Sequence, residues 1–438
     1  MQNSQLKTNN SRLINAWAFY DWANSVYPLV ITSTIFPIYF NSITSTENSD
    51  IITLFGHDFV NTALYSYALS FSFLIIALIS PILSGIADYK GNKKSFMKFF
   101  CYLGAVSCSS MCFFDSSNLW LGLTSMILAS IGFSGSLIFY NAYLPEITTP
   151  DNFDRVSAKG FSLGYIGSSL LLIFNLTMIL YPEIYGITDD SFPARFSFVL
   201  VGVWWVGFAQ ITFKYLPEGS VEHELKENIL SKGYGELKRV WNELVHQLNL
   251  KTYLFAFFFY NMGVQTVMYA AVLFGDKELK LESGQLITSI LIIQFIAIGG
   301  AYLFSNLSDK FGNIKALTWS VLIWIGICIA AYFVYEANEF YMLAAMVGLV
   351  MGGIQSLSRS TYAKFLPKDR EQNAYFSFFD ITEKLAIVLG MFCFGLIEDI
   401  TGDMRNSVIA LTLFFVVGLI LLLRVKVQDS MIEDLNIR

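Results

Sequence analysis

The sequence predicts an all-α protein that crosses a membrane many times. Hydrophobic residues make up 55% of the 438 residues and charged residues only 14%, and the mean hydropathy is +0.53. This composition excludes a soluble globular protein and argues against nucleic-acid binding. The chain also contains twelve apolar runs of about 18 to 28 residues, each long enough to cross a hydrocarbon core of about 30 Å as a helix. The runs cover residues 14–41, 61–86, 96–114, 118–142, 161–181, 195–216, 252–274, 284–306, 316–335, 339–357, 375–398 and 406–425.

The distribution of positive charge predicts the orientation of these twelve transmembrane helices. Because twelve is even, both termini lie on the same side of the membrane. Of the 28 lysines and arginines, 23 fall in segments on the side of the termini, and Lys384 lies within a run. The four on the opposite side are Arg195, Lys277, Lys280 and Arg405. Since Lys and Arg are enriched in cytoplasmic segments, we expect both termini in the cytoplasm.

A polar stretch from about Leu216 to Lys251 divides the runs into two sets of six. The sequence therefore predicts an N-terminal bundle over 1–216, a cytoplasmic linker over 217–251 and a C-terminal bundle over 252–438. Part of the linker, ELKRVWNELVHQLNL, has the spacing of a helix with one apolar face. Such a helix either lies at the membrane interface or packs on the protein, and both alternatives stay open. Its apolar face consists of Leu237, Trp241, Leu244 and Leu248.

The two halves of the chain share a short repeat. GIADYKGNKKS follows the second run and NLSDKFGNIKA follows the eighth. A glycine in such a turn allows a reversed backbone, and an aspartate can cap a helix or form a salt bridge. The residue types alone fit any tight charged turn, but the common spacing indicates an internal duplication. The pairs, each 221 residues apart, are Asp88 and Asp309, Gly91 and Gly312, Asn92 and Asn313, and Lys94 and Lys315.

This turn, D-x-x-G-x-x-K, resembles the signature loop of the major facilitator superfamily. Within that superfamily, AFYDWANSVY near the start, FYNAYLPEI with GYIGSSL in the middle, and GGIQSLSRSTYAKFLP later are similar to the vacuole-effluxer-like family. That family contains fungal vacuolar amino-acid effluxers and bacterial relatives. Two features depart from the pattern: Asn306 stands where the first turn has Gly85, and the central loop is short. The short loop is typical of a bacterial member, so we expect a bacterial inner (plasma) membrane rather than a vacuole.

The resemblance implies two six-helix bundles that rock about a central site, with the first, fourth, seventh and tenth helices lining it. It also implies a secondary transporter that moves a small polar solute by alternating access, with amino acids as the expected substrates. The acid at Asp21 adds the expectation that export is coupled to a proton. A carrier for sugars, peptides or drugs is the alternative. The polar residues of those four helices become candidates for substrate binding or coupling: Asp21, Asn24, Tyr27, Tyr140, Asn141, Asn261, Gln265, Tyr269, Gln355 and Arg359.

Asp21 is the candidate that is hardest to explain by packing. An acid at the centre of a transmembrane helix costs roughly 2.5 to 3.5 kcal/mol on insertion scales. Asp21, Asn24 and Ser25 are spaced i, i+3 and i+4 and so share one helix face, and Pro28 just beyond can free a carbonyl or bend the helix. Two roles for Asp21 stay open, proton carrier and cytoplasmic gate. The amides on the other helices can also serve simply as contacts between helices.

A second charged cluster lies in the eleventh run. In FFDITEKL, Asp380 and Lys384 form an i, i+4 pair near the expected cytoplasmic end, with Glu383 beside them, and such a pair can simply neutralise itself. The resemblance places Asp88 against the start of this helix, where the helix dipole favours a carboxylate. The expected cytoplasmic gate comprises Gly85, Asp88, Gly91, Lys94, Asp309, Gly312, Lys315, Asp380, Glu383 and Lys384.

Enzymatic and metal-dependent functions find no support in the residues. None of the three histidines lies within a run, and the five cysteines fall in apolar segments without a Cys-x-x-Cys pair. No Gly-Lys-Ser/Thr phosphate-binding motif is present, and the external loops are short. A polytopic membrane enzyme or scaffold is therefore a weaker alternative. We expect no metal and no cofactor; the expected partners are a small-molecule substrate, protons and the lipid bilayer.

Overall fold

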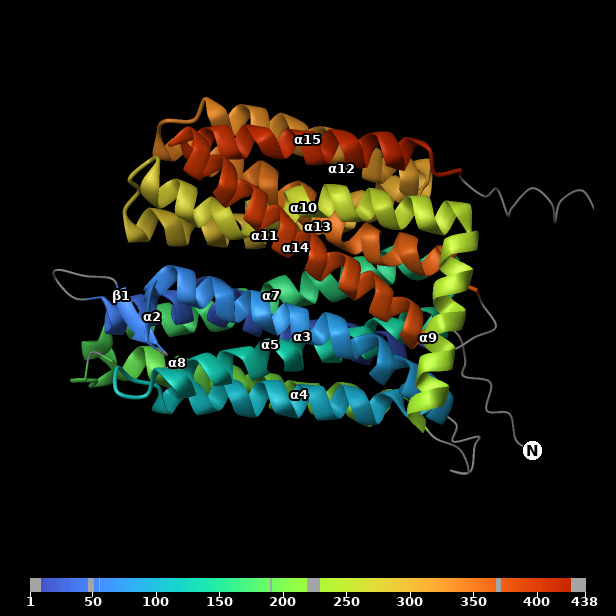
Figure 1. The fold of residues 1–438 in the computed structure, drawn as a ribbon, viewed down its shortest axis with the longest axis horizontal. Helices are drawn as coiled ribbons and strands as arrows, with labels where there is room; N and C mark the ends of the chain where they lie inside the picture. Colours follow the sequence, from blue (N-terminus) through green and yellow to red (C-terminus); the bar gives the residue numbers. More distant parts are fainter. Residues whose placement is uncertain are drawn as a thin grey trace, which may run out of the picture.

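The computed structural model is a bundle of long, roughly antiparallel helices (Figure 1). It describes residues 9–45, 51–54, 56–189, 191–218, 229–367 and 372–426. The first part of the chain forms α1 (Ser11–Asn24), α2 (Phe36–Thr44), α3 (Asn61–Lys90), α4 (Lys93–Ser110), α5 (Leu119–Ala142), α6 (Leu144–Ile147), α7 (Phe153–Leu180) and α8 (Phe192–Tyr215). The second part forms α9 (Ile229–His246), α10 (Leu248–Lys277), α11 (Ser283–Phe311), α12 (Asn313–Tyr332), α13 (Ala337–Phe365), α14 (Asn373–Thr401) and α15 (Met404–Leu423). A hairpin of β1 (Ile51–Leu54) and β2 (His57–Val60) lies in the loop before α3, where no strand was predicted.

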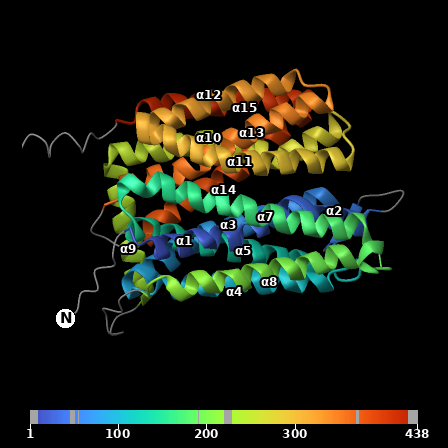
Figure 2. The same ribbon diagram turned by 180° about the vertical axis from the view of Figure 1, so that it is seen from behind.

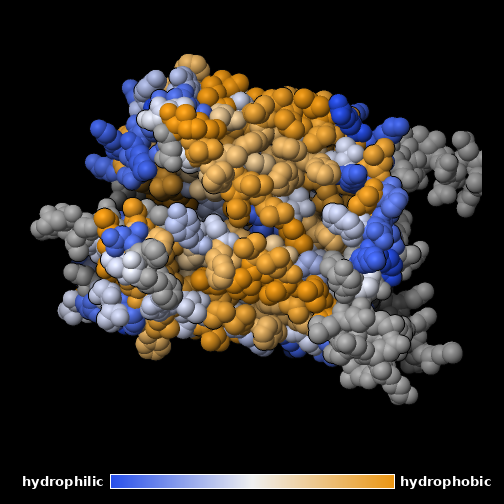
Figure 3. Space-filling model, viewed as in Figure 1, coloured by the Kyte–Doolittle hydropathy of each residue, from blue (hydrophilic) through white to orange (hydrophobic). Residues whose placement is uncertain are grey.

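Eleven of the twelve predicted spans correspond to helices that are long and apolar enough to cross a membrane, within the described residues. The twelfth prediction, 375–398, falls on α14, which has 29 residues and therefore sufficient length. Its apolar run is interrupted by Asp380, Glu383 and Lys384, so composition alone does not mark it as a span. Figure 3 shows an apolar belt across the middle of the molecule with hydrophilic residues at both ends, as expected for a protein embedded in a bilayer.

The first span is not one continuous α-helix. After α1 the chain widens into a π-helical segment, Tyr27–Ile35, and then returns to α-helix in α2. Pro28 lies at the start of the wide segment and has no N–H to donate, which removes one bond of the regular ladder. Side chains satisfy carbonyls in this region: the Thr34 hydroxyl donates to the Leu29 carbonyl (2.7 Å) and the Tyr65 hydroxyl to the Thr32 carbonyl (2.6 Å). The irregularity predicted from Pro28 is therefore present, as a π-helix.

The repeated turns adopt the reversed backbone that their glycines predict. Gly91 has φ 64° after α3, and Gly312 has φ 87° after α11. A residue with a side chain is disfavoured at such angles, whereas glycine reaches them without steric cost. Each turn reverses the chain within one or two residues, so α4 and α12 begin beside the ends of α3 and α11.

Helices α1 to α8 lie in one half of the molecule and α10 to α15 in the other (Figures 1 and 2). The two halves meet through α7 against α11 and α13, and through α3 and α5 against α14. These four pairings place the interior surface of one half directly against that of the other. Any polar group on these surfaces is therefore positioned to contact the opposite half.

Helix α9 runs across one end of the bundle, roughly at right angles to the other helices (Figure 1). Val240 and Leu244 are buried, and the Trp241 ring packs 5.7 Å from the Phe378 ring of α14. These contacts support the alternative in which the linker helix packs on the protein. The predicted apolar face was partly wrong, because Leu248 begins α10 and is exposed. The Leu237 side chain lies outside the described residues.

Candidate functional site

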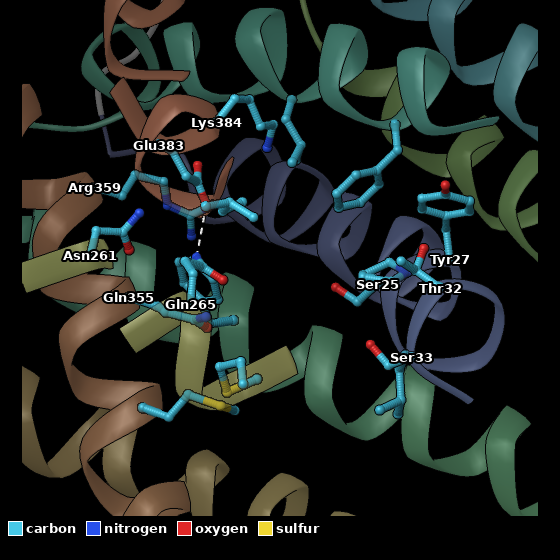
Figure 4. A pocket seen from close by; sticks show the side chains of 18 of the residues that line it. Ser25, Tyr27, Thr32, Ser33, Asn261, Gln265, Gln355, Arg359, Glu383 and Lys384 are labelled. Atoms are coloured by element: carbon cyan, nitrogen blue, oxygen red, sulfur yellow. Dashed lines mark hydrogen bonds between the residues drawn. The ribbon is translucent and has the colours of Figure 1, made fainter. Parts of the chain in front are cut away.

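A cavity of about 240 Å³ lies between the two halves. Four of the lining helices, α1, α5, α10 and α13, are the first, fourth, seventh and tenth spans, as the resemblance implied. The π-helical segment, α3, α7, α11 and α14 contribute as well. Figure 4 shows Ser25, Tyr27, Thr32 and Ser33 on one side of the cavity and side chains from α10, α13 and α14 on the other. Nine of the ten predicted binding or coupling residues line this cavity: Asp21, Asn24, Tyr27, Asn141, Asn261, Gln265, Tyr269, Gln355 and Arg359.

Asp21 forms a buried ion pair with Arg359, which joins α1 of one half to α13 of the other. The guanidinium nitrogens Nη1 and Nη2 each lie 3.3 Å from Asp21 Oδ2. Both residues are buried, at 4% and 3% exposure. Tyr140, the predicted residue that does not line the cavity, donates its hydroxyl proton to the same Oδ2 at 2.8 Å. The sequence proposed Asp21, Tyr140 and Arg359 separately, and the structure brings them together.

The Arg359 guanidinium has further partners besides Asp21. Its Nε donates to the Ser157 hydroxyl and its Nη2 to the Ser157 carbonyl, both at 2.9 Å, and Nη1 lies 3.4 Å from Asn141 Oδ1. The guanidinium also lies over the Phe161 ring at 4.3 Å and the Trp17 ring at 4.9 Å. A buried cation whose N–H donors are satisfied and which lies against aromatic faces is well stabilised. The surroundings of Arg359 therefore stabilise the ion pair in this conformation.

Close approach of α1 and α7 depends on three glycines of α7. A Cβ atom at Gly160 would lie 2.4 Å from Asp21 Oδ2 and 3.0 Å from Arg359 Nη2. At Gly164 it would lie 2.4 Å from the Ser25 hydroxyl, and at Gly167 2.7 Å from the Trp22 carbonyl. The spacing i, i+4, i+7 puts these glycines on one helix face. The absence of side chains on that face leaves room for the ion pair.

The charged cluster of α14 is not at the end of the molecule, which corrects the prediction that placed it near the cytoplasmic end. Glu383 and Lys384 line the central cavity. Glu383 is ten residues beyond the start of α14 at Asn373, a rise of about 15 Å along a helix. Lys384 Nζ lies 3.5 Å from Asp380 Oδ1, confirming the predicted i, i+4 pair, and Gln265 Nε2 donates to Glu383 Oε1 at 3.1 Å (Figure 4).

Several polar atoms of the cavity are buried and have no hydrogen-bond partner among the described residues. They are Asn24 Nδ2, the Tyr27 hydroxyl, the Thr32 hydroxyl, Asn261 Nδ2 and Gln294 Oε1. An unpaired buried polar group costs about 1 to 3 kcal/mol. Groups of this kind, gathered around one cavity, are the groups that a polar solute would satisfy.

Charged contacts between the halves gather at one end of the bundle, where α3 and α11 finish and α7 and α14 begin; we call this the closed end. Asp88 accepts hydrogen bonds from the backbone N–H groups of Ala374 (2.8 Å) and Asn373 (3.2 Å) and from the Asn373 amide (2.5 Å). The contact implied between Asp88 and the start of α14 is therefore present. It places a carboxylate at the positive end of a helix dipole.

A second contact at the closed end involves Asp154, which the sequence did not single out. Asp154 is buried in the first turn of α7 and pairs with Lys364 of α13 at 2.7 Å. It also accepts hydrogen bonds from the Ser308 hydroxyl and the Asn313 amide, both at 2.7 Å. Asp88 and Asp154 thus tie the halves together through α14 on one side and α11 to α13 on the other.

The other predicted gate residues have different surroundings. Lys94 donates to the Leu216 carbonyl at 2.8 Å and lies 3.4 Å from Glu218 Oε1, so it fixes the end of α8 within its own half. Asp309 and Lys315 are exposed. Gly85 is buried within α3. The two copies of the repeated turn therefore make different contacts.

A family model described as "Vacuole effluxer Atg22 like" matches residues 9–435. The chain belongs to this Atg22-like family. It is 31% identical over 419 residues to the uncharacterized MFS-type transporter YxiO of Bacillus subtilis, covering 95% of each chain. Its fold is similar to that of the Escherichia coli fucose:proton symporter FucP, with a TM-score of 0.68 at 16% identity over 95% of this chain and 98% of that one. A bacterial homologue of the iron transporter ferroportin in an outward-facing state gives 0.67 at 12% identity, over 94% and 98%.

Membership of the family settles the class of the protein. This Atg22-like chain is an all-α, multi-pass integral membrane protein with the major facilitator fold. It is a secondary transporter of that superfamily and not an enzyme, and its substrate is a small molecule.

The Atg22-like site contains groups that sequence reasoning missed. Ser157 holds Arg359, the Tyr165 hydroxyl donates to Gln355 Oε1 at 2.6 Å, and Lys364 pairs with Asp154. Ser157 and Tyr165 belong to α7, the fifth span, which the family pattern did not include among the lining helices. One signal was available: Asp154 is an acid in the first turn of a transmembrane helix, a position where a helix dipole favours negative charge.

Proposed function

We propose that this transporter exports a small polar solute, an amino acid, by proton-coupled alternating access. The observation that carries the proposal is the Asp21–Arg359 pair, a buried titratable contact that spans the two halves beside the central cavity. The cavity volume of about 240 Å³ lies below the roughly 300 to 1,000 Å³ of sites for drug-sized ligands, which supports a small solute. The amino-acid class rests on the family, whose matching model is described as a vacuole effluxer.

The ion pair links protonation of Asp21 to movement of the two halves because it lies between them. Arg359 and Asp21 belong to opposite halves, so separation of the halves at the closed end must break their contact. An unpaired charge buried at such a site is strongly unfavourable. A proton on Asp21 neutralises the carboxylate and removes the attraction to Arg359, which lowers the free energy needed to open this end. The cavity then becomes accessible from this end, where the solute to be exported enters.

The orientation and division of the molecule are part of the proposal. We place the closed end and both termini in the cytoplasm, because 22 of the 28 lysines and arginines belong to segments on that side once Arg359, which is buried at the cavity, is left out. The described state is then closed toward the cytoplasm. We assign residues 1–216 and 252–438 to two bundles that move against each other, joined by the linker 217–251. A plasma-membrane location fits the similarity to the Bacillus subtilis relative.

Flux measurements test the proposal. Liposomes that contain the purified protein are loaded with a panel of labelled amino acids. Efflux is then followed with and without a pH gradient, for the natural protein and for Asp21→Asn. Glu398→Gln is the matched control, because Glu398 also forms an ion pair, with Lys277 at 3.6 Å, but within one half and partly exposed.

We expect gradient-driven efflux in the natural protein and in Glu398→Gln, and loss of the response to the gradient in Asp21→Asn. Efflux of the amino acids that ignores the pH gradient would reject proton coupling. No efflux or exchange of any amino acid by well-folded protein would reject the substrate class and direct the search to sugars, peptides and drugs.

A further inference from the structure

The central cavity carries an excess of negative charge. Two ion pairs have at least one member in the lining of the cavity. They are Asp21 with Arg359, at 3.3 Å, and Asp380 with Lys384, at 3.5 Å. Glu383 also lines the cavity, and its carboxylate has no cation within salt-bridge distance among the described residues. With every group in its ordinary ionised form, the two pairs cancel and Glu383 remains.

The immediate partners of Glu383 leave room for a positive ligand. Gln265 donates one hydrogen bond to Oε1, at 3.1 Å. Lys384, the neighbouring residue, is already paired with Asp380 and lies 5.5 Å from the centre of the Phe73 ring. A carboxylate can accept about four hydrogen bonds, so one amide donor does not saturate it. A hydrogen bond from a cationic donor stabilises an ionised carboxylate more than a hydrogen bond from a neutral donor does.

Unpartnered groups around the same cavity point independently to a ligand. Gln294 on α11 is 7% exposed, and its Oε1 acceptor has no partner among the described residues. Asn261, one helical turn before Gln265, is 5% exposed, and its amide nitrogen likewise lacks a partner there. Asn261, Gln265 and Glu383 are grouped on the same side of the cavity in Figure 4. The cavity therefore offers a carboxylate and an amide acceptor for the donors of one ligand.

We propose that Glu383 is the specificity-determining residue of the cavity and binds a protonated amino group of the transported solute. The carboxylate of Glu383 supplies acceptors for the N–H donors of an ammonium group, and Gln294 adds an unpartnered acceptor to the lining of the same cavity. The cavity accordingly selects solutes that carry a protonated amine, and a carboxylate on the solute is not required. This inference rests on the proposed function only in taking the cavity to be the solute site.

Binding of three matched probes tests the inference. Valine has both charged groups, isobutylamine lacks the carboxylate, and 3-methylbutanoate lacks the amine. Isothermal titration calorimetry with the full-length protein in lipid nanodiscs gives the dissociation constant of each probe for the natural protein, Glu383→Gln, Glu383→Asp and Glu398→Gln. Glu398→Gln is the control because Glu398 lies on the same helix but pairs with Lys277 outside the cavity.

We expect the natural protein to bind isobutylamine and valine at least tenfold more tightly than 3-methylbutanoate. Glu383→Gln should weaken the two amines at least tenfold and leave the acid unchanged, Glu383→Asp should retain part of the affinity, and Glu398→Gln should match the natural protein. Unchanged amine affinity in well-folded Glu383→Gln overturns the inference. So does equal or preferred binding of the acid, or the absence of amine binding in the natural protein. Flux of a solute without an amine would overturn this inference while leaving a transport function in place.

Discussion

Replacing Asp21 with Asn should shift the protein away from the state described above. The substitution keeps the size of the side chain and an oxygen that can accept from Tyr140, but removes the charge that faces Arg359 at 3.3 Å. Removing one partner of a buried ion pair costs about 3 to 5 kcal/mol. The lower value applies here, because Arg359 keeps its bonds to Ser157. About 3 kcal/mol corresponds to a shift on the order of a hundredfold in the equilibrium between conformations.

Double electron–electron resonance, which gives the distance distribution between two spin labels, measures this shift. Ser95→Cys and Lys310→Cys place labels on exposed positions of opposite halves at the closed end. The partly exposed Cys112 and Cys393 are replaced by Ser beforehand. We expect Asp21→Asn to move most of the distance distribution to longer values.

Two further variants make the outcome of this measurement decisive. Glu398→Gln removes a carboxylate from an ion pair that lies within one half, so it should leave the distances unchanged. The double variant Asp21→Asn with Arg359→Gln leaves no uncompensated charge and should recover part of the original distribution. If Asp21→Asn is monodisperse and has the same distances as the natural protein, the pair does not hold the closed end together.

Three other substitutions probe the same equilibrium with the same labels. Asp88→Asn removes a charge from the start of α14, where the dipole interaction contributes about 1 kcal/mol, so we expect roughly a fivefold shift toward opening. Asp154→Asn should open the closed end by a similar factor, because Lys364 loses its charged partner. Gly160→Ala forces a methyl group against the ion pair and should lengthen the distances, whereas Gly299→Ala, with no atom within 4 Å, should not.

Hydropathy and charge predicted most of the fold because the bilayer imposes a simple rule on span length. The exception, α14, shows the limit of that rule. Asp380, Glu383 and Lys384 break its apolar run, yet the helix continues through them because its charges face protein partners such as Gln265. The π-helical segment was also beyond sequence reasoning. Pro28 indicates a disturbed ladder, but the surrounding packing decides whether the chain kinks or widens.

The site was predicted as a set of residues but not as a set of contacts. Asp21 and Arg359 were both visible as charges on lining helices, whereas their pairing joins positions 338 residues apart. Asp154 and Lys364 escaped notice because each resembles an ordinary charge at a helix end. Only the packing of α7 against α11 and α13 makes their contact one between the halves.

Helix α14 links the closed end to the cavity in one rigid element. Its first residues, Asn373 and Ala374, hold Asp88, and Glu383 reaches the cavity about 15 Å further along the same helix. A ligand shifts a conformational equilibrium only as far as its affinity differs between the states. A solute bound at Glu383 acts on the helix that carries the Asp88 contact, whereas a proton on Asp21 acts on the contact between α1 and α13. The two ligands therefore act on different contacts between the halves. For export they must bind in alternation, because a proton on Asp21 favours opening of the closed end toward the cytoplasm, whereas a solute that enters there must leave through the other end.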